Sequence, residues 1–157
     1  MTFLDDYDRK VADIIAEHGV FLQGVFPTKE DPPGPVFVYT VGLTLQNHPE
    51  LIEFGLPYKY AGHILNDLAA RVHQQGQTLE PYVEMDDEVA DYPAKLIPVL
   101  DSTEHLTMAN RFFAEMEPAG EVSAYQLVYP DAGARWPWDP GYSLNPVLQP
   151  LLGLPPP

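Results

Sequence analysis

The sequence contains no cysteine and few basic residues, and each absence excludes a class of protein. Without cysteine, the 157 residues can form no disulfide, no thiolate zinc site and no cysteine nucleophile, which fits a reducing compartment. Only eight Lys and Arg side chains oppose 23 Asp and Glu, so the net charge is −15. This charge repels nucleic acids and anionic membranes, and we expect neither as a partner. We interpret the acidic excess as a solvated surface rather than an acidic docking surface.

Long apolar runs are also missing. None approaches the roughly 18 residues of a membrane span, and the first residues lack the basic and apolar regions of a signal peptide. We therefore expect a cytoplasmic protein that does not enter a membrane. A chain of this length fits one domain, and neither an internal repeat nor a linker divides it.

Hydrophobic periodicity predicts both helices and strands. The predicted helices span about residues 3–18, 58–75 and 103–116. Strands are predicted at about 20–26, 36–43, 51–56, 94–100 and 124–129. The acidic segment 80–91 lacks the order of a calcium-binding loop, and we interpret it as a solvated loop or an edge hairpin. The predicted element order is α-β-β-β-α-β-β-α-β, with two strands between the second and third helices.

Short turns between neighbouring strands permit antiparallel pairs, whereas only the helical segments are long enough for crossovers. The sequence thus predicts an α+β fold, with about three helices packed against a mainly antiparallel sheet. We expect one globular domain over residues 1–142. Residues 143–157 form a proline-rich C-terminal tail, either an extended wrap or partly disordered.

The densest combination of apolar and unusual polar residues lies at 36–57. Residues 36–43 are typical of a strand buried on both faces, and a His-Pro-Glu turn then leads into a second apolar run. Gly42 near the end of the first run indicates a bulge, the close approach of another backbone or a ligand, or a closely packed helix.

Two groups of residues are candidates for function. Tyr39, His48 and Glu50 could meet at the end of the central strand as catalytic groups, with His48 as general base and Glu50 orienting it or binding a cation. The alternative is that His48 and Glu50 cap the turn.

The second group consists of Arg135, Trp136, Trp138 and Asp139 in a proline-rich loop. Aromatic walls beside a single cation suit a planar or anionic small molecule, and we regard these four residues as candidate ligand-binding groups. The alternative is a tryptophan lid that closes the core.

Motifs for established chemistry are absent. The five histidines show no H-x-x-x-H or H-E-x-x-H spacing, so no metal site is predicted. No G-x-S-x-G, Walker or Rossmann signature occurs. A flavin-type split barrel is favoured only by the strand-rich order and by residues 41–44, so the cofactor stays unknown.

Several short motifs occur together in one order. They are the stretch 37–43, His48-Pro49-Glu50-Leu51, Phe54-Gly55-Leu56-Pro57, Tyr129-Pro130-Asp131 and Trp136-Pro137-Trp138. In this combination the chain resembles a bacterial family known only as domain-of-unknown-function family 4262, over roughly residues 3–142. The family commonly has Gly before the His-Pro pair, where this chain has Asn47. The resemblance implies a small cytoplasmic single-domain protein and no particular reaction, and it does not extend to the tail.

Two classes of function remain. In the first, the domain binds a small molecule or cofactor in a pocket between the His48-Pro49-Glu50 corner and the loop of Arg135 to Trp138. In the second, it is a non-enzymatic protein-interaction or regulatory module that uses the tryptophan loop. The sequence leaves open whether the protein is an enzyme and what its oligomeric state is.

Overall fold

The structure, a computed structural model, describes residues 6–32, 34–85, 93–114 and 121–157. Over these residues the helices are α1 (Asp6–His18), α2 (Tyr58–His73) and α3 (Thr107–Phe112), with two short 3-10 helices, η1 (Leu43–Gln46) and η2 (Pro146–Leu148). The strands are β1 (Phe21–Val25), β2 (Phe37–Val41), β3 (Glu50–Phe54), β4 (Lys95–Pro98) and β5 (Ala124–Val128). No helix within the described ranges is long and apolar enough to cross a bilayer.

The strands form one five-stranded sheet in the order β1-β2-β3-β5-β4. Every neighbouring pair is antiparallel except β3 and β5, which run parallel. The chain between β3 and β5 contains two helices and β4, which gives it the length that a parallel return requires. The predicted α+β class and mainly antiparallel sheet are therefore confirmed, and the sheet is mixed rather than purely antiparallel.

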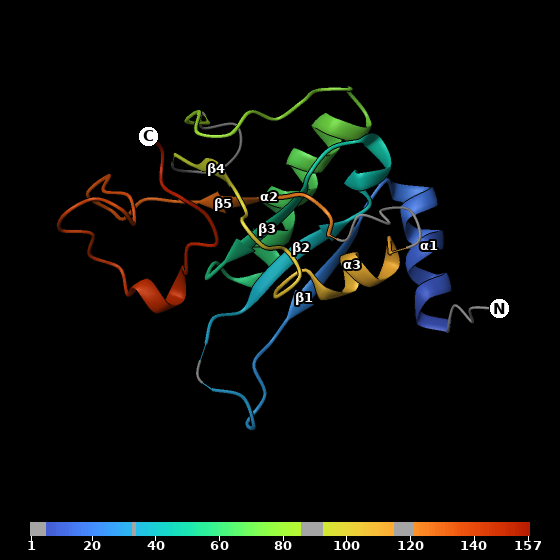
Figure 1. The fold of residues 1–157 in the computed structure, drawn as a ribbon, viewed down its shortest axis with the longest axis horizontal. Helices are drawn as coiled ribbons and strands as arrows, with labels where there is room; N and C mark the ends of the chain where they lie inside the picture. The colour runs from blue at the N-terminus through green and yellow to red at the C-terminus, as the bar shows by residue number, and fades with distance from the viewer. Residues whose placement is uncertain (1–5, 33, 86–92, 115–120) are drawn as a thin grey trace.

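Helices cover both faces of the sheet, so the fold has three layers (Figure 1). On one face, Leu65 of α2 belongs to a buried cluster with Leu51 of β3. On the other face, Val11 of α1 and Ala109 of α3 share a second cluster with Ile52. Because neighbouring residues of a strand point to opposite faces, β3 contributes to both clusters. The central strands are thus buried on both sides, as the apolar run of the sequence predicts.

The boundaries and buried stripe predicted for α2 agree with the structure. The helix begins directly after Pro57, which suits a helix start because its missing N–H has no partner to lose there. The apolar residues at helical spacing are all buried: Ala61, Ile64, Leu65, Leu68, Ala69 and Val72. Gly76 follows with a left-handed backbone (φ 67°), the conformation expected just beyond a helix end.

Two predicted elements differ from the structure. The third helix begins at Thr107 rather than near 103, because the Ser102 hydroxyl donates to the Val122 carbonyl (2.6 Å) and does not cap a helix. In place of an edge strand before β4, the described part of the acidic segment makes an isolated bridge between Met85 and Ala94. The third helix also ends earlier than predicted, at Phe112. The rest of that predicted strand, residues 115–116 of the predicted third helix and the start of the first lie outside the described residues.

The C-terminal segment 143–157 lies along β5 and is held there by two glutamine side chains. Gln126 of β5 donates to the Pro150 carbonyl (2.7 Å) and accepts from the Leu152 N–H (2.8 Å). Gln149, itself buried, accepts from the N–H of Tyr129 (2.9 Å) and donates to its carbonyl (3.0 Å). The Gln126 amide thus satisfies backbone groups of the C-terminal segment, and the Gln149 amide satisfies those of Tyr129, directly after β5.

Candidate functional site

A polar corner, formed by residues 40–50, lies where β2 and β3 stop pairing. Direct pairing ends at Tyr39 and Ile52. One residue further along β2, the Thr40 hydroxyl accepts a hydrogen bond from the Leu51 N–H (2.9 Å) and donates one to the Glu50 carboxylate (2.8 Å). The Thr40 side chain therefore replaces a ladder hydrogen bond and holds the two strands apart at this point.

Gly42 allows the chain to leave β2. Its φ is +143°, and a Cβ atom at this position would lie 2.7 Å from the Gly19 carbonyl oxygen. Only glycine accommodates both the backbone conformation and the contact. Of the explanations open for this glycine, the close approach of another backbone is the one observed.

Glu50 is fully buried and organises the corner. Its two carboxylate oxygens accept five hydrogen bonds. The donors are the hydroxyls of Thr40 (2.8 Å) and Thr44 (2.6 Å) and the backbone N–H groups of Gly42 (3.1 Å), Leu43 (3.0 Å) and Thr44 (2.8 Å). The backbone donors are the N–H groups at the start of η1, which have no partner within that helix. The Glu50 carboxylate thus supplies the acceptors for the first N–H groups of the 3-10 helix η1.

Two opposing effects set the protonation of Glu50. Burial raises its pKa, while the hydrogen bonds from Thr44, Thr40 and Gly42 lower it. The geometry fits the carboxylate form, since backbone N–H groups can only donate and the carboxyl accepts every one of the five bonds. Neither oxygen is directed at an open site, and the candidate role of Glu50 as a catalytic partner of His48 has no geometric support.

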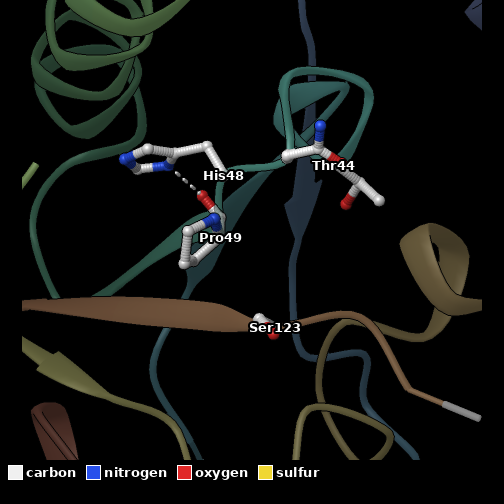
Figure 2. A pocket seen from close by; sticks show the side chains of 5 residues that line it. Thr44, His48, Pro49 and Ser123 are labelled. Atoms are coloured by element: carbon white, nitrogen blue, oxygen red, sulfur yellow. Dashed lines mark hydrogen bonds between the residues drawn. The ribbon is translucent and has the colours of Figure 1, made fainter. Parts of the chain in front are cut away.

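His48 is buried and hydrogen-bonded through both ring nitrogens. Nδ1 lies 2.8 Å from the Pro49 carbonyl oxygen (Figure 2), and Nε2 accepts from the Leu79 N–H (3.1 Å). Because a backbone N–H donates to Nε2, the proton is assigned to Nδ1 and the imidazole to its neutral form. The ring edge also packs against Tyr125, with centroids 6.0 Å apart. His48 therefore holds the polar corner against the loop after α2. This is a structural role, which agrees with the alternative that His48 caps the turn.

Tyr39 does not join His48 and Glu50. Its side chain is in the cluster beneath α1 and α3, and its hydroxyl accepts from the Met108 N–H at the start of α3 (3.0 Å). Burial raises its pKa, while the hydrogen bond from Met108 opposes that effect. The structure therefore does not bring Tyr39 together with His48 and Glu50. The Tyr39 hydroxyl is bonded to the start of α3, whereas the Glu50 carboxylate is bonded within the corner and His48 to Leu79.

A hollow of about 340 Å³, the corner pocket, opens at the polar corner. Its described lining residues are Thr44, Asn47, His48, Pro49 and Ser123. They come from the η1 turn, the entry to β3 and the residue before β5 (Figure 2). Asn47 has a left-handed backbone (φ 55°), and Ser123 accepts a hydrogen bond from the Glu50 N–H through its carbonyl (2.9 Å). The pocket walls are thus joined to the frame that Glu50 stabilises.

The proline-rich loop after β5 is organised by Asp131. Its buried carboxylate accepts from the N–H groups of Gly133 (2.9 Å), Arg135 (2.9 Å) and Ser143 (2.8 Å). It also accepts from the Ser143 hydroxyl (2.9 Å) and from Nε of Arg135 (3.1 Å). Burial acts to raise the pKa of Asp131, but the hydrogen bonds from Arg135 and Ser143 outweigh it and hold the pKa well below its usual range. The Arg135 guanidinium is therefore engaged within the loop.

The two tryptophans close a small core at the end of β5, beside the loop that Asp131 organises. Trp136 and Trp138 stack with centroids 5.6 Å apart, and the Lys95 ammonium lies 4.5 Å from the Trp136 centroid. Trp136 is only 8% exposed and packs with Val128. The Asp139 carboxylate accepts from the Trp136 N–H (2.9 Å). The arrangement matches the tryptophan lid, the alternative to a ligand-binding role for these side chains.

The structure does not bring the two candidate groups together. Glu50 pairs with Ala124, the first residue of β5, whereas the tryptophan loop follows Val128, the last. The polar corner and the loop thus lie at opposite ends of that strand, and the described lining of the hollow at the corner includes no residue of the loop. The predicted shared pocket is absent for a topological reason: β3 and β5 are parallel, so the start of β3 lies beside the start of β5.

Sequence reasoning missed the hydroxyls that build the corner. Thr40 and Thr44 flank Gly42, and Glu50 follows at the next strand, so a glycine-marked strand end between two threonines was the available signal. Ser123 carried no local signal, because only the parallel pairing of β3 and β5 places it there. In the described part of the chain, no group of three or more His, Asp or Glu side chains is arranged to hold a metal ion.

Comparison with known proteins identifies the family. The model for "Domain of unknown function (DUF4262)" matches residues 14–143. This chain belongs to the DUF4262 family. The match runs from the last turn of α1 through the tryptophan loop, so the polar corner lies within the DUF4262 domain. No curated protein and no solved structure matches the chain.

Proposed function

We propose that this DUF4262 domain is a non-catalytic module that binds a small polar molecule in the corner pocket. The observation that carries the proposal is the frame behind the pocket: five hydrogen bonds to Glu50 fix the turn that supplies Thr44 and Asn47. Ligand sites are usually concave and already formed before binding, since a rigid wall loses little conformational entropy when the ligand arrives.

The lining favours a neutral or cationic ligand. Thr44 and Ser123 offer hydroxyls and Asn47 offers an amide, so both donors and acceptors are within the pocket. Its described lining includes no Lys or Arg, the His48 ring is held by hydrogen bonds at both nitrogens, and the Glu50 carboxylate lies directly behind the wall. Phosphates and carboxylates would therefore be repelled.

Binding rather than catalysis is favoured because the candidate catalytic groups are already engaged. General-base action by His48 requires a free lone pair within reach of the substrate, and its Nε2 accepts from Leu79. A catalytic use would require the loop carrying Leu79 to move away. The alternative of an interaction module based on the tryptophan loop is not favoured by any exposed aromatic patch, because Trp136 is buried.

Amide chemical-shift mapping of the ¹⁵N-labelled protein tests the proposal. The probes are three sets of small fragments: neutral amides and polyols, protonated amines, and carboxylates with phosphates. We expect the first two sets to shift the amides of Thr44, Asn47 and Ser123 and the anionic set to leave them unchanged. Anions that bind there as well as neutral fragments would contradict the ligand class, and an absence of shifts at all three amides would contradict the function.

A further inference from the structure

A second hollow, of about 320 Å³, lies at the other end of the central strands and is called here the aromatic pocket. The connection between β1 and β2 forms one side of it, and the turn before α3 and the C-terminal segment form the other. Its main lining residues are Phe26, Pro35, Phe37, Phe54, His105 and Pro150. Phe37 begins β2 and Phe54 ends β3, whereas the corner pocket lies where β2 ends and β3 begins. The two pockets are therefore separate.

Three aromatic rings form the wall of this pocket. Phe37 and Phe54 stack with centroids 4.8 Å apart and an interplanar angle of 29°. The His105 ring stands nearly perpendicular to both, at 5.6 Å from Phe37 and 5.4 Å from Phe54. Phe26 adds a fourth ring that is more than half exposed. Aromatic faces of this kind attract cations as well as apolar groups.

His105 carries a polar atom that the fold leaves without a partner. Its Nδ1 is buried, and no described residue forms a hydrogen bond with it. A buried polar atom without a partner costs on the order of 1–3 kcal/mol, and such atoms in native proteins call for an explanation. The neighbouring phenylalanine rings offer no conventional hydrogen bond. Because Nδ1 has almost no exposed surface, a ligand N–H in the aromatic pocket would supply the missing donor only after the His105 ring turns to present this nitrogen.

The charge around the aromatic pocket is negative. Asp31 is among its lining residues, and one oxygen of its carboxylate accepts from the N–H (2.8 Å) and the hydroxyl (3.0 Å) of Thr28. These bonds, the backbone one first, lower the pKa of Asp31, so it is ionised at neutral pH. No Lys or Arg is among the described lining residues, and the chain as a whole carries −15. A positively charged ligand is therefore favoured over an anion.

We propose that the aromatic pocket binds a protonated amine attached to an apolar body, with an ammonium N–H donated to Nδ1 of His105. The apolar body lies against Phe26, Phe37 and Phe54, and the Asp31 carboxylate favours the positive charge. This site is independent of the corner pocket, so either proposal can fail without the other.

Isothermal titration with two matched probes tests the ligand class. The probes are 2-phenylethylammonium and 3-phenylpropionate, which share the phenyl group and differ in the sign of the charge. We expect the ammonium to bind at least about tenfold more tightly, equivalent to about 1.4 kcal/mol. It should also shift the His105 Nδ1 resonance in a long-range ¹H–¹⁵N spectrum. Equal affinity for the anion, or binding that leaves that resonance unchanged, would overturn the proposal.

Variants locate the site. Phe26→Ala removes an exposed ring of the pocket and should weaken the binding of 2-phenylethylammonium. Leu45→Ala, at another exposed apolar residue, located at the polar corner, should not. His105→Phe keeps a ring in the wall but removes the acceptor. It should raise the denaturant midpoint, because the unpaired buried nitrogen of His105 is removed, and still lower the affinity. An affinity unchanged in both Phe26→Ala and His105→Phe would show that the amine binds elsewhere.

Discussion

The Thr40 hydroxyl donates to the buried Glu50 carboxylate across the point where β2 and β3 separate. The same hydroxyl accepts from the Leu51 N–H. Thr40 therefore forms both the last bond between β2 and β3 and the first hydrogen bond of the polar corner. Glu50 continues the corner by accepting from the first N–H groups of η1. The corner is therefore a structural frame, and the pocket beside it derives its rigidity from that frame.

Identical substitutions at two buried glutamates separate a required carboxylate from a dispensable one. Glu50→Gln leaves one oxygen for five donors, so several buried donors lose their acceptor, and we expect a loss of about 3 kcal/mol or more in the free energy of unfolding. Glu53, equally buried on the same strand, accepts only from the Leu56 N–H (3.1 Å), and its second oxygen has no partner among the described residues.

Glu53→Gln keeps that single acceptor and should change stability by less than about 1 kcal/mol. Urea unfolding of both variants at pH 6, where Glu53 is protonated in the folded state, provides the comparison. Equal losses in the two variants would contradict the special role of Glu50.

Stability should fall as the pH rises because of Glu53. Burial raises its pKa from 4.5 to about 8, and the hydrogen bond from Leu56 only partly opposes this. A pKa that folding raises means that the folded state retains a proton that the unfolded state releases. The stabilisation is complete below pH 4.5 and is lost as the pH rises through 8, at up to roughly 1.4 kcal/mol per pH unit. The difference in free energy of unfolding between the wild type and Glu53→Gln, measured from pH 5 to 9, should follow this decline. A pH-independent difference would show that Glu53 ionises normally.

His48→Ala should destabilise the domain. The substitution empties a buried ring position and leaves the Leu79 N–H without its acceptor, for an expected loss of about 2–4 kcal/mol. Hydrogen exchange at the Leu79 amide should accelerate at the same time. A fully stable His48→Ala protein with a protected Leu79 amide would contradict a structural role and restore the catalytic interpretation.

Leu68 provides a reference for the core. It is fully buried on the inner face of α2, and Leu68→Ala should cost about 2–5 kcal/mol through the cavity it leaves. The matched control is His63→Ala on the exposed side of the same helix, where the contact with Asp67 (3.5 Å) lies at the surface. Surface pairs contribute little, so this variant should unfold within about 0.5 kcal/mol of the wild type. A denaturant midpoint unchanged by Leu68→Ala would contradict the predicted packing.

The fold could be predicted largely from local patterns. The buried stripe of α2 and the apolar run of β2 each carry their periodicity in consecutive residues, so their type and approximate limits agree with the structure. The third helix was predicted too long because Ser102, a good capping residue by type, is bonded to the distant Val122 carbonyl instead. A side chain used in a tertiary contact is not visible in local propensity.

The site could be predicted only in part, for the same reason. His48 and Glu50 stood out as unusual residues at a strand end, but their partners decide what they do. Leu79 follows His48 by 31 positions, and Met108 follows Tyr39 by 69. The shared pocket failed because the parallel alignment of β3 with β5 could not be inferred from either strand.

The affinity of the best neutral or cationic fragment for Ser123→Phe tests the central claim most directly. Ser123 is exposed at the corner pocket, and only its backbone supports the fold, so a phenylalanine there fills the pocket and leaves the Glu50 frame intact. Ala16→Phe, at an exposed position of α1, is the matched control. We predict at least about tenfold weaker binding to Ser123→Phe, equivalent to about 1.4 kcal/mol, with an unchanged denaturant midpoint and wild-type affinity in Ala16→Phe. A Ser123→Phe protein that binds as tightly as the wild type would contradict the corner pocket as the ligand site.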